Sequence, residues 1–271
     1  IIDTPITETA IVGACVGAAL AGMRPVADMH FADFAGVCFD EIYNQMAKIY
    51  YMFGGQKSVS MVLRAPDGLT NQAAAQHSQS LEAFFQHIPG LKVVIPSNPA
   101  DAKGLLKAAI RDDNPVIYFE HKALFPMKGE VPEEEYITPI GKAKVVREGK
   151  DITLVSYSMT MNHSIKAADI LAKEGISVEL VDLRSISPID SETIINSVVK
   201  TSRLAIAHEA VKQGGVGGEI AAIVAEEAID CLDAPIVRIG APFTPVPFAR
   251  PLEQAYRVTP EKIAAAIRGM M

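Results

Sequence analysis

Glu8 is the first residue whose surroundings point to chemistry, because this carboxyl group stands at the head of a long apolar run. Residues 11–23 carry no charge, and Thr4 followed by Pro5 predicts a helix start, with Gly22 as the stop signal. Such a helix is apolar on every face, so we expect it in the core. Two interpretations of Glu8 stay open: a first-turn carboxylate that complements the helix dipole, or an acid held in an apolar site to move protons.

A second group of candidates surrounds His77, in the run AAQHSQ at residues 74–79. This run follows a predicted strand and precedes a predicted helix, on the kind of loop at which parallel sheets bind ligands. A histidine there can transfer protons near neutral pH, or it can be a hydrogen-bonded structural residue. His30 and His208 also lie at predicted strand ends, with a weaker signal, and Glu209 follows His208. The sequence has no nucleophile elbow and no HExxH metal pattern.

Two glycine-containing segments allow either ligand binding or tight packing. QGGVGG at residues 213–218 opens a predicted helix and can cradle a phosphate. It lacks the GxGxxG spacing and the lysine of a phosphate-binding loop, so close packing of strand and helix is the favoured interpretation. The other segment, Pro66-Asp67-Gly68, predicts a turn after the preceding strand.

Strands and helices alternate along the chain, which predicts an α/β protein with mainly parallel sheets. In the first half the predicted strands are 26–29, 59–63, 92–95 and 116–119, and the predicted helices are 40–51, 80–87 and 100–111. In the second half the predicted strands are 151–157, 178–182, 204–208 and 236–239, and the predicted helices are 162–173, 190–200, 218–229 and 260–268. Residues 122–149 read as a linker with a solvated run of acids, so we predict two domains, 1–140 and 141–271.

The composition excludes several functional classes. The chain of 271 residues has a net charge of -7 and no basic block, so we expect no nucleic-acid binding. Cys15, Cys38 and Cys231 show no CxxC spacing and are expected as buried thiols in a reducing compartment. Because no signal peptide or membrane-length apolar run is present, we expect no membrane partner and a location in the cytoplasm, or in the mitochondrial matrix of a eukaryote. The start at Ile-Ile-Asp, without Met, predicts an upstream segment.

Several long segments carry a resemblance to a known family: DTPITE, AGMRPVADMHFADF, NQMAKIYYMFGG, AAAQHSQSLEAFFQHIPGLKVVIPS, DAKGLLKAAIRDDNPVIYFEHK and IGKAKVVREGKDITLVSYS. In this order, over essentially the whole chain, they resemble the β subunit of the thiamine-diphosphate-dependent first component of 2-oxo acid and acetoin dehydrogenase complexes. The resemblance implies a transketolase-like pyrimidine-binding domain followed by a transketolase C-terminal domain. It also implies that chains of the family extend further at the amino end.

The resemblance assigns roles to residues that match the motifs of the family. Glu8 matches the glutamate that hydrogen-bonds a ring nitrogen of the cofactor's aminopyrimidine, which helps to remove the thiazolium proton and is general acid-base work. Phe34 matches an aromatic side chain that packs on the pyrimidine. His77 matches a histidine that transfers a proton while the acyl group passes to a lipoyl arm. His30 falls where relatives place a residue that lines the pocket, so we include it among the cofactor-binding residues.

Metals and partner subunits follow from the resemblance as well. Ala109, Ile110, Asp112 and Asn114 match a loop that binds potassium in several relatives, largely through backbone carbonyl oxygens. The diphosphate-magnesium motif of this cofactor class, GDG followed by Asn, does not occur in the chain. The resemblance therefore implies an α subunit that holds magnesium and the diphosphate of thiamine diphosphate, in an α2β2 heterotetramer docked on a lipoyl acyltransferase core.

The substrate is indicated by two segments, DFAGVCFDEIYNQ and APFTPVPFARPLEQAY. They look most like acetoin dehydrogenase β subunits, which implies cleavage of acetoin and oxidative transfer of its acetyl unit to lipoamide. Pyruvate- and branched-chain-specific relatives share the rest of the pattern. Two alternatives from other classes stay open: one half of a split transketolase, and a non-catalytic scaffold, against which the acid at position 8 argues.

Overall fold

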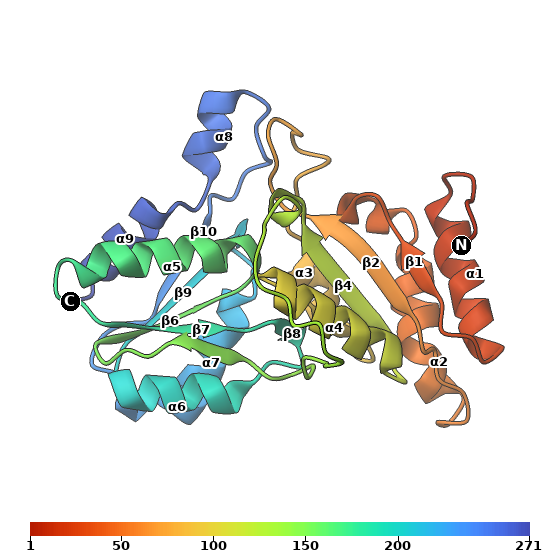
Figure 1. Cartoon of the computed structure of the whole chain (residues 1–271), viewed down its shortest axis with the longest axis horizontal. Coiled ribbons are helices and arrows are strands. Elements are labelled where there is room, and N and C mark those ends of the chain that lie inside the picture. The colour runs from red at the N-terminus through yellow and green to blue at the C-terminus, as the bar shows by residue number, and fades with distance from the viewer.

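Two five-stranded sheets form the framework of the protein, and the computed structural model describes every residue from Ile1 to Met271. The strand order of the first sheet is β1 (Val26–Asp28), β2 (Val62–Asp67), β4 (Val116–His121), β3 (Lys92–Val94) and β8 (Ser185–Ser187). The strand order of the second sheet is β10 (Val237–Ala241), β9 (Leu204–Val211), β6 (Ile152–Ser156), β7 (Val178–Asp182) and β5 (Lys144–Arg147). Figure 1 shows the two sheets side by side, with the amino-terminal half at the right.

The pairing within both sheets is mainly parallel. Antiparallel pairing is confined to β3 with β8 and to β5 with β7. The predicted α/β class with mainly parallel sheets is therefore confirmed. Strand β8 comes from the second half of the chain but lies in the first sheet, so sheet membership does not divide at residue 140. The predicted boundary between two domains stays a prediction.

Nine α-helices cover the sheets. They are α1 (Glu8–Leu20), α2 (Ala47–Met52), α3 (Glu82–Gln86), α4 (Pro99–Arg111), α5 (Ser158–Ala172), α6 (Ser191–Thr201), α7 (Gly217–Glu227), α8 (Arg250–Tyr256) and α9 (Pro260–Arg268). Side chains satisfy free amides at several helix starts, since Asn98 accepts a hydrogen bond from Asp101 N at 2.9 Å. Asp190 accepts one from Thr193 N at 3.3 Å and caps α6.

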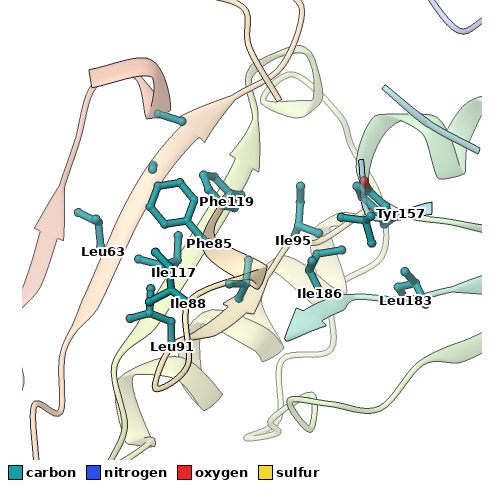
Figure 2. Packing of buried hydrophobic residues seen from close by; sticks show 14 of the residues in the cluster. Leu63, Phe85, Ile88, Leu91, Ile95, Ile117, Phe119, Tyr157, Leu183 and Ile186 are labelled. Carbon is teal, nitrogen blue, oxygen red and sulfur yellow. The ribbon is translucent and has the colours of Figure 1, made fainter. Parts of the chain in front are cut away.

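An apolar core runs from the first sheet into the second half of the chain. Figure 2 shows Phe85 and Phe119 beside the first sheet, and Tyr157, Leu183 and Ile186 continue the same cluster toward the second. Each of these side chains is at most 2% exposed. Because burial of apolar area is the main favourable contribution to folding, this shared core fixes the arrangement of the two sheets.

Helix α1 differs from its prediction in both its start and its burial. It begins at Glu8 instead of Pro5, and Thr7 occupies the cap position without a side-chain hydrogen bond. Its buried side chains lie on one face: Val12, Val16 and Ala19. Figure 1 places the helix at the outer edge of the first sheet, beside β1. Alanine and glycine have little apolar area to bury, so a run of them does not require a place in the core.

Other predicted elements are shifted or changed. The strand predicted at 59–63 occupies 62–67, and the helix predicted at 40–51 is a π-helical segment, Glu41–Met46, followed by α2. Residues 122–149 are docked and not merely solvated, because Glu135 pairs with Lys107 on α4 at 2.5 Å. Of the cysteines, only Cys38 is buried, while the other two are partly exposed. No helix combines the length and apolar character needed to cross a membrane.

Candidate active site

The loop that carries His77 joins β2 to α3 and spans residues 68–81; we call it the His77 loop. The His77 ring lies edge-on to two aromatic rings, with centroid distances of 4.9 Å to Phe31 and 5.4 Å to Phe34. Phe34 belongs to a 3₁₀ turn, Ala32–Gly36, that follows β1. The structure thus brings together the carboxyl ends of β1 and β2, and with them the predicted residues Phe34 and His77. Their roles stay predictions.

Hydrogen bonds tie this turn to the His77 loop. Asp33 Oδ1 accepts hydrogen bonds from Gln79 N at 3.2 Å and from Gln79 Nε2 at 2.8 Å. Lys122, which follows β4, has its Nζ 5.3 Å from the Phe31 ring centroid. Burial lowers the pKa of this lysine, which has no hydrogen-bond partner. The Phe31 ring therefore sits between the imidazole of His77 and a buried amine.

Glu8 lies near the segment that follows the Phe34 turn. Thr9 Oγ1 donates a hydrogen bond to the carbonyl of Val37 at 3.2 Å, so the first turn of α1 rests on the segment after the Phe34 turn. Burial, with the charges of Glu41 and Glu8 nearby, raises the pKa of the Cys38 thiol to about 12. The Glu8 carboxylate is half-buried and has no hydrogen bond or ion pair within the chain. A partly buried acid without an internal partner is free to bind a ligand.

His30 is the predicted residue that the structure leaves apart. It is exposed, directly after β1, and makes no aromatic contact with His77 or Phe34. Its neighbour Phe31 takes the position against the His77 ring instead. The predicted pocket role of His30 stays a prediction.

A buried polar cluster lies beneath the His77 loop, and sequence reasoning missed it. His121 Nε2 on β4 lies 2.8 Å from Glu209 Oε1 on β9. Tyr157 Oη donates to Glu82 Oε1 at 2.5 Å. Asp67 is the last residue of β2 and only 1% exposed, so it does not lie in the predicted turn. Their positions in the sequence could have revealed them, because Asp67, His121 and Glu209 lie at or near the carboxyl ends of parallel strands.

The cluster contains one charged pair and two acids that resist ionisation. Burial alone would lower the pKa of His121, but the Glu209 carboxylate outweighs it and raises this pKa above its ordinary value. Burial alone would raise the pKa of Glu209, and His121 outweighs that effect and lowers it. Burial raises the pKa of Asp67 to about 8 and also raises that of Glu82. Each group therefore favours the charged form of the other, and the two form a buried ion pair when His121 is protonated.

Comparison with known proteins decides the family. The pyrimidine-binding domain of transketolase matches residues 1–128, and the transketolase C-terminal domain matches residues 141–263. The β subunit of acetoin:2,6-dichlorophenolindophenol oxidoreductase from Cupriavidus necator is 51% identical over 271 residues, which is 100% of this chain and 80% of that protein. The chain belongs to the thiamine-dependent dehydrogenase β subunits.

Further matches also extend along nearly the whole chain. The 2-oxoisovalerate dehydrogenase β subunit of Bacillus subtilis is 47% identical over 270 residues, covering 99% of this chain and 83% of that protein. A solved structure described as a split-gene transketolase, inactive β4 tetramer, has a TM-score of 0.82 at 26% identity and covers 99% of this chain and 83% of that chain. The transketolase-like fold is thus confirmed. Membership among β subunits of dehydrogenase complexes implies an α partner.

The predicted potassium loop of the β subunit already receives a positive charge from Arg24. Arg24 Nη1 donates to the carbonyl oxygen of Asp112 at 2.8 Å and to that of Ile110 at 3.3 Å. The carbonyl of Ala109 accepts from Asp112 N, and Asn114 donates to the Asp112 carboxylate. In this conformation the loop does not fit potassium, whose binding stays a prediction. No group of three or more His, Cys, Asp or Glu side chains is arranged to hold a metal ion.

The glycine-rich segment 213–218 packs against His208. A Cβ atom on Gly215 would lie 2.6 Å from His208 Cε1, and one on Gly217 would lie 2.9 Å from Nε2. Only glycine allows this close approach, so the favoured packing interpretation is confirmed. Burial lowers the pKa of His208 to about 4, which keeps the imidazole neutral in the core of the β subunit.

Proposed function

We propose that this chain is the β subunit of a thiamine-diphosphate-dependent acetoin dehydrogenase, which cleaves acetoin and passes the acetyl unit oxidatively to lipoamide. The observation that carries the proposal is the 51% identity, along the complete chain, to a β subunit whose name specifies acetoin. The main alternative is a pyruvate or branched-chain 2-oxo acid dehydrogenase β subunit. The 47% identity to a 2-oxoisovalerate dehydrogenase β subunit supports that alternative.

The side chains around the His77 loop fit the aminopyrimidine half of the cofactor. When bound, thiamine diphosphate supplies a nucleophilic carbon that cleaves the bond beside the substrate carbonyl. Glu8, an acid without an internal partner, would share a proton with a ring nitrogen of the aminopyrimidine. The half-buried Phe34 offers an aromatic surface for the ring. His77, held edge-on by Phe31 and Phe34, donates or accepts a proton as the acyl group leaves for the lipoyl arm.

An α subunit supplies magnesium and binds the diphosphate, in an α2β2 heterotetramer that docks on a lipoyl acyltransferase core. Exposed apolar side chains at the end of α2 support a covering subunit, since Tyr51, Met52 and Phe53 are 86%, 76% and 54% exposed. Such side chains are typical of the buried centre of an interface. A split-gene transketolase described as inactive in a β4 tetramer fits the same requirement for a second kind of subunit.

The test is turnover by a complex reconstituted from the full-length chain, its α subunit, thiamine diphosphate and magnesium. Acetoin, pyruvate and a branched 2-oxo acid are offered in parallel, with a dye as electron acceptor. We expect turnover of acetoin, and a loss of at least about 100-fold in Glu8→Gln, because the amide cannot hold the proton relay of a carboxylate. Glu41→Gln is the matched control: this half-buried acid faces α1 near Gly13, and its replacement should leave turnover at the wild-type rate.

The outcomes separate the alternatives. Turnover of pyruvate or the branched acid alone retains the mechanism and replaces the substrate. An assembled complex that is inert on all three compounds supports the non-catalytic scaffold. Turnover of sugar phosphates without any need for lipoamide would identify a split transketolase. Equal activity of wild type and Glu8→Gln would refute the role of Glu8.

A further inference from the structure

The His77 loop is fastened by side chains that belong to the second half of the chain. Leu69 N donates a hydrogen bond to Glu209 Oε1 at 2.6 Å, and Ser80 Oγ donates to the same oxygen at 3.5 Å. Near the middle of the loop, Gln72 N donates to Glu253 Oε2 at 3.0 Å. Both ends of the loop therefore meet one carboxylate, which lies on β9 of the second sheet.

Glu209 holds the loop at a defined place because its own position is strongly determined. Its carboxylate is paired with His121, whose side chain is 2% exposed, and neither group can move toward water without losing its partner. A buried ion pair that loses one member leaves an uncompensated charge, which is strongly unfavourable. The pairing with His121 therefore restricts the Glu209 carboxylate to one position.

The base of the loop leaves no room for adjustment. Gly68 N donates to the carbonyl of Gln79 at 3.1 Å and closes the loop. Gly68 has φ +78°, and a Cβ atom there would lie 2.2 Å from His121 Nε2 and 2.9 Å from Glu209 Oε1. The backbone of the loop therefore rests directly on the ion pair.

The side of the loop that faces the second half of the chain also borders open space. A pocket of about 330 Å³ lies between the loop and the second half of the chain, and its lining includes Ser78, Phe84, Glu209, Val246 and Tyr256. Without its fastening the loop can shift into this pocket. The contacts to Glu209 at both ends of the loop oppose such a shift, together with the bonds from Gln72 N to Glu253 and from Arg257 to the carbonyl of Thr70.

We propose that Glu209 is a positioning residue for His77: through His121 and the two ends of the His77 loop, the second sheet sets where the His77 ring meets the acyl group. This inference rests on the proposed function for the role of His77. Glu209 itself does not touch the reacting atoms. It acts by keeping the ring against Phe31 and Phe34 while substrate and acceptor enter.

The experiment compares two rates in the reconstituted complex: dye-coupled oxidation, and reductive acylation of a free lipoyl domain. In Glu209→Gln we expect the ratio of acylation to dye reduction to fall roughly tenfold, because a small displacement of a proton-transferring group has a large effect on rate. The matched control is Glu179→Gln, which alters a carboxylate that is 2% exposed, on β7 of the same sheet. Its ratio should stay at the wild-type value.

Hydrogen exchange supplies a readout that does not depend on the reaction. We expect faster exchange of the amides of residues 69–80 in Glu209→Gln than in wild type, and no such change in Glu179→Gln. If Glu209→Gln does not assemble, Ser80→Ala removes one bond to the carboxylate and should shift both readouts in the same direction by less. A fall of both rates in proportion, with unchanged exchange, overturns the proposal. Failure of wild type to turn over any substrate refutes the proposed function instead, and the exchange data still test the positioning.

Discussion

Glu179 and Glu209 are buried carboxylates on the same sheet, yet they connect different parts of the molecule. Glu179 accepts hydrogen bonds from Ser197 Oγ at 2.5 Å and from Gly149 N at 3.1 Å, and it pairs with Lys200. All of its partners belong to the second half of the chain. Glu209 meets the His77 loop and His121, which belong to the first half.

Glu179 therefore stabilises the second half of the chain internally, whereas Glu209 connects the second half to the first. The Glu179 cluster closes one side of the second sheet, and its lysine reaches solvent with a side chain 43% exposed. The Glu209 cluster has no such exit, because both members of its ion pair are largely buried. A carboxylate placed like Glu179 stabilises one half of the chain. A carboxylate placed like Glu209 makes the position of the His77 loop depend on how the two sheets pack.

The largest effect in this comparison is expected at Gly68. In Gly68→Ala the new Cβ atom meets the His121 ring at 2.2 Å, in a backbone conformation that disfavours side chains. We expect a loss of about 4 kcal/mol in the free energy of unfolding, from the clash, the strain and the disturbed ion pair together. Chemical denaturation measures it.

Gly175→Ala is the matched control for the backbone. Gly175 has a similar φ of +83°, but nothing lies within 4 Å of its Cβ position. The cost should therefore be the conformational penalty alone, about 1 kcal/mol. Equal losses at the two glycines would show that the ion pair yields to the new methyl group.

Removing Glu209 or Glu179 should lower the free energy of unfolding by less than Gly68→Ala does, and the loss should be larger for Glu209. Glu209→Ala leaves the imidazole of His121 buried without its partner, and we expect a loss of about 3 kcal/mol. Glu179→Ala leaves the amide of Gly149 without its partner, while Ser197 keeps its hydrogen bond to Thr153 and Lys200 turns to water, so we expect about 2 kcal/mol. Denaturant midpoints of the two variants, measured with the same slope, test this order.

A larger loss in Glu179→Ala than in Glu209→Ala would mean that water reaches His121 once the Glu209 side chain is removed. Glu253→Gln tests the other carboxylate that contacts the His77 loop: the glutamine keeps an oxygen that can accept from Gln72 N, but it loses the ion pair with Arg257. Its effect should be smaller than that of Glu209→Ala. A larger effect would move the main fastening of the loop from its ends to its middle.

Local pattern predicted much of the fold and the part of the site that is local. The alternation of β-branched runs with helical segments was enough to predict mainly parallel sheets, because strands that are buried on both faces consist largely of apolar residues. The loop position of His77 and, for Phe34, the resemblance to the family predicted two residues whose rings do lie together, at 5.4 Å. Both sit at the carboxyl ends of neighbouring strands, where the sheet topology alone brings them close.

What could not be predicted depends on contacts between distant segments. The pairing of Glu209 with His121 spans 88 positions and requires the two sheets to pack first. Strand β8 joins the first sheet from the second half for the same reason. The start of α1 was misplaced because Thr4 and Pro5 carry a valid local signal, yet the helix begins at Glu8 and is held by the bond from Thr9 to Val37.

The two clusters should also respond to a change of pH in opposite directions. Burial alone would raise the pKa of Glu179, but hydrogen bonds from Lys200, Ser197 and Gly149 N outweigh it and lower this pKa. Its contribution to stability is therefore present above its ordinary pKa and is lost as pH falls through the lowered value. Burial raises the pKa of Asp67 to about 8, so the contribution of this acid is complete below its ordinary pKa and is lost as pH rises through 8.

Asp67→Asn tests how much Asp67 contributes to the fall of the unfolding free energy with rising pH, and it changes the side chain only from an acid to an amide. The amide cannot ionise, so we expect the unfolding free energy to fall less between pH 6 and 9 than in wild type, by up to about 1.4 kcal/mol per pH unit. His121, with a raised pKa, acts in the same direction as Asp67, while burial lowers the pKa of Lys122 and opposes them at higher pH. Asp169→Asn, an exposed acid paired with Arg147, should leave the alkaline slope unchanged. An unchanged slope in Asp67→Asn would mean that Asp67 is already ionised at neutral pH, and the cluster beneath the His77 loop would then carry one more negative charge than its burial indicates.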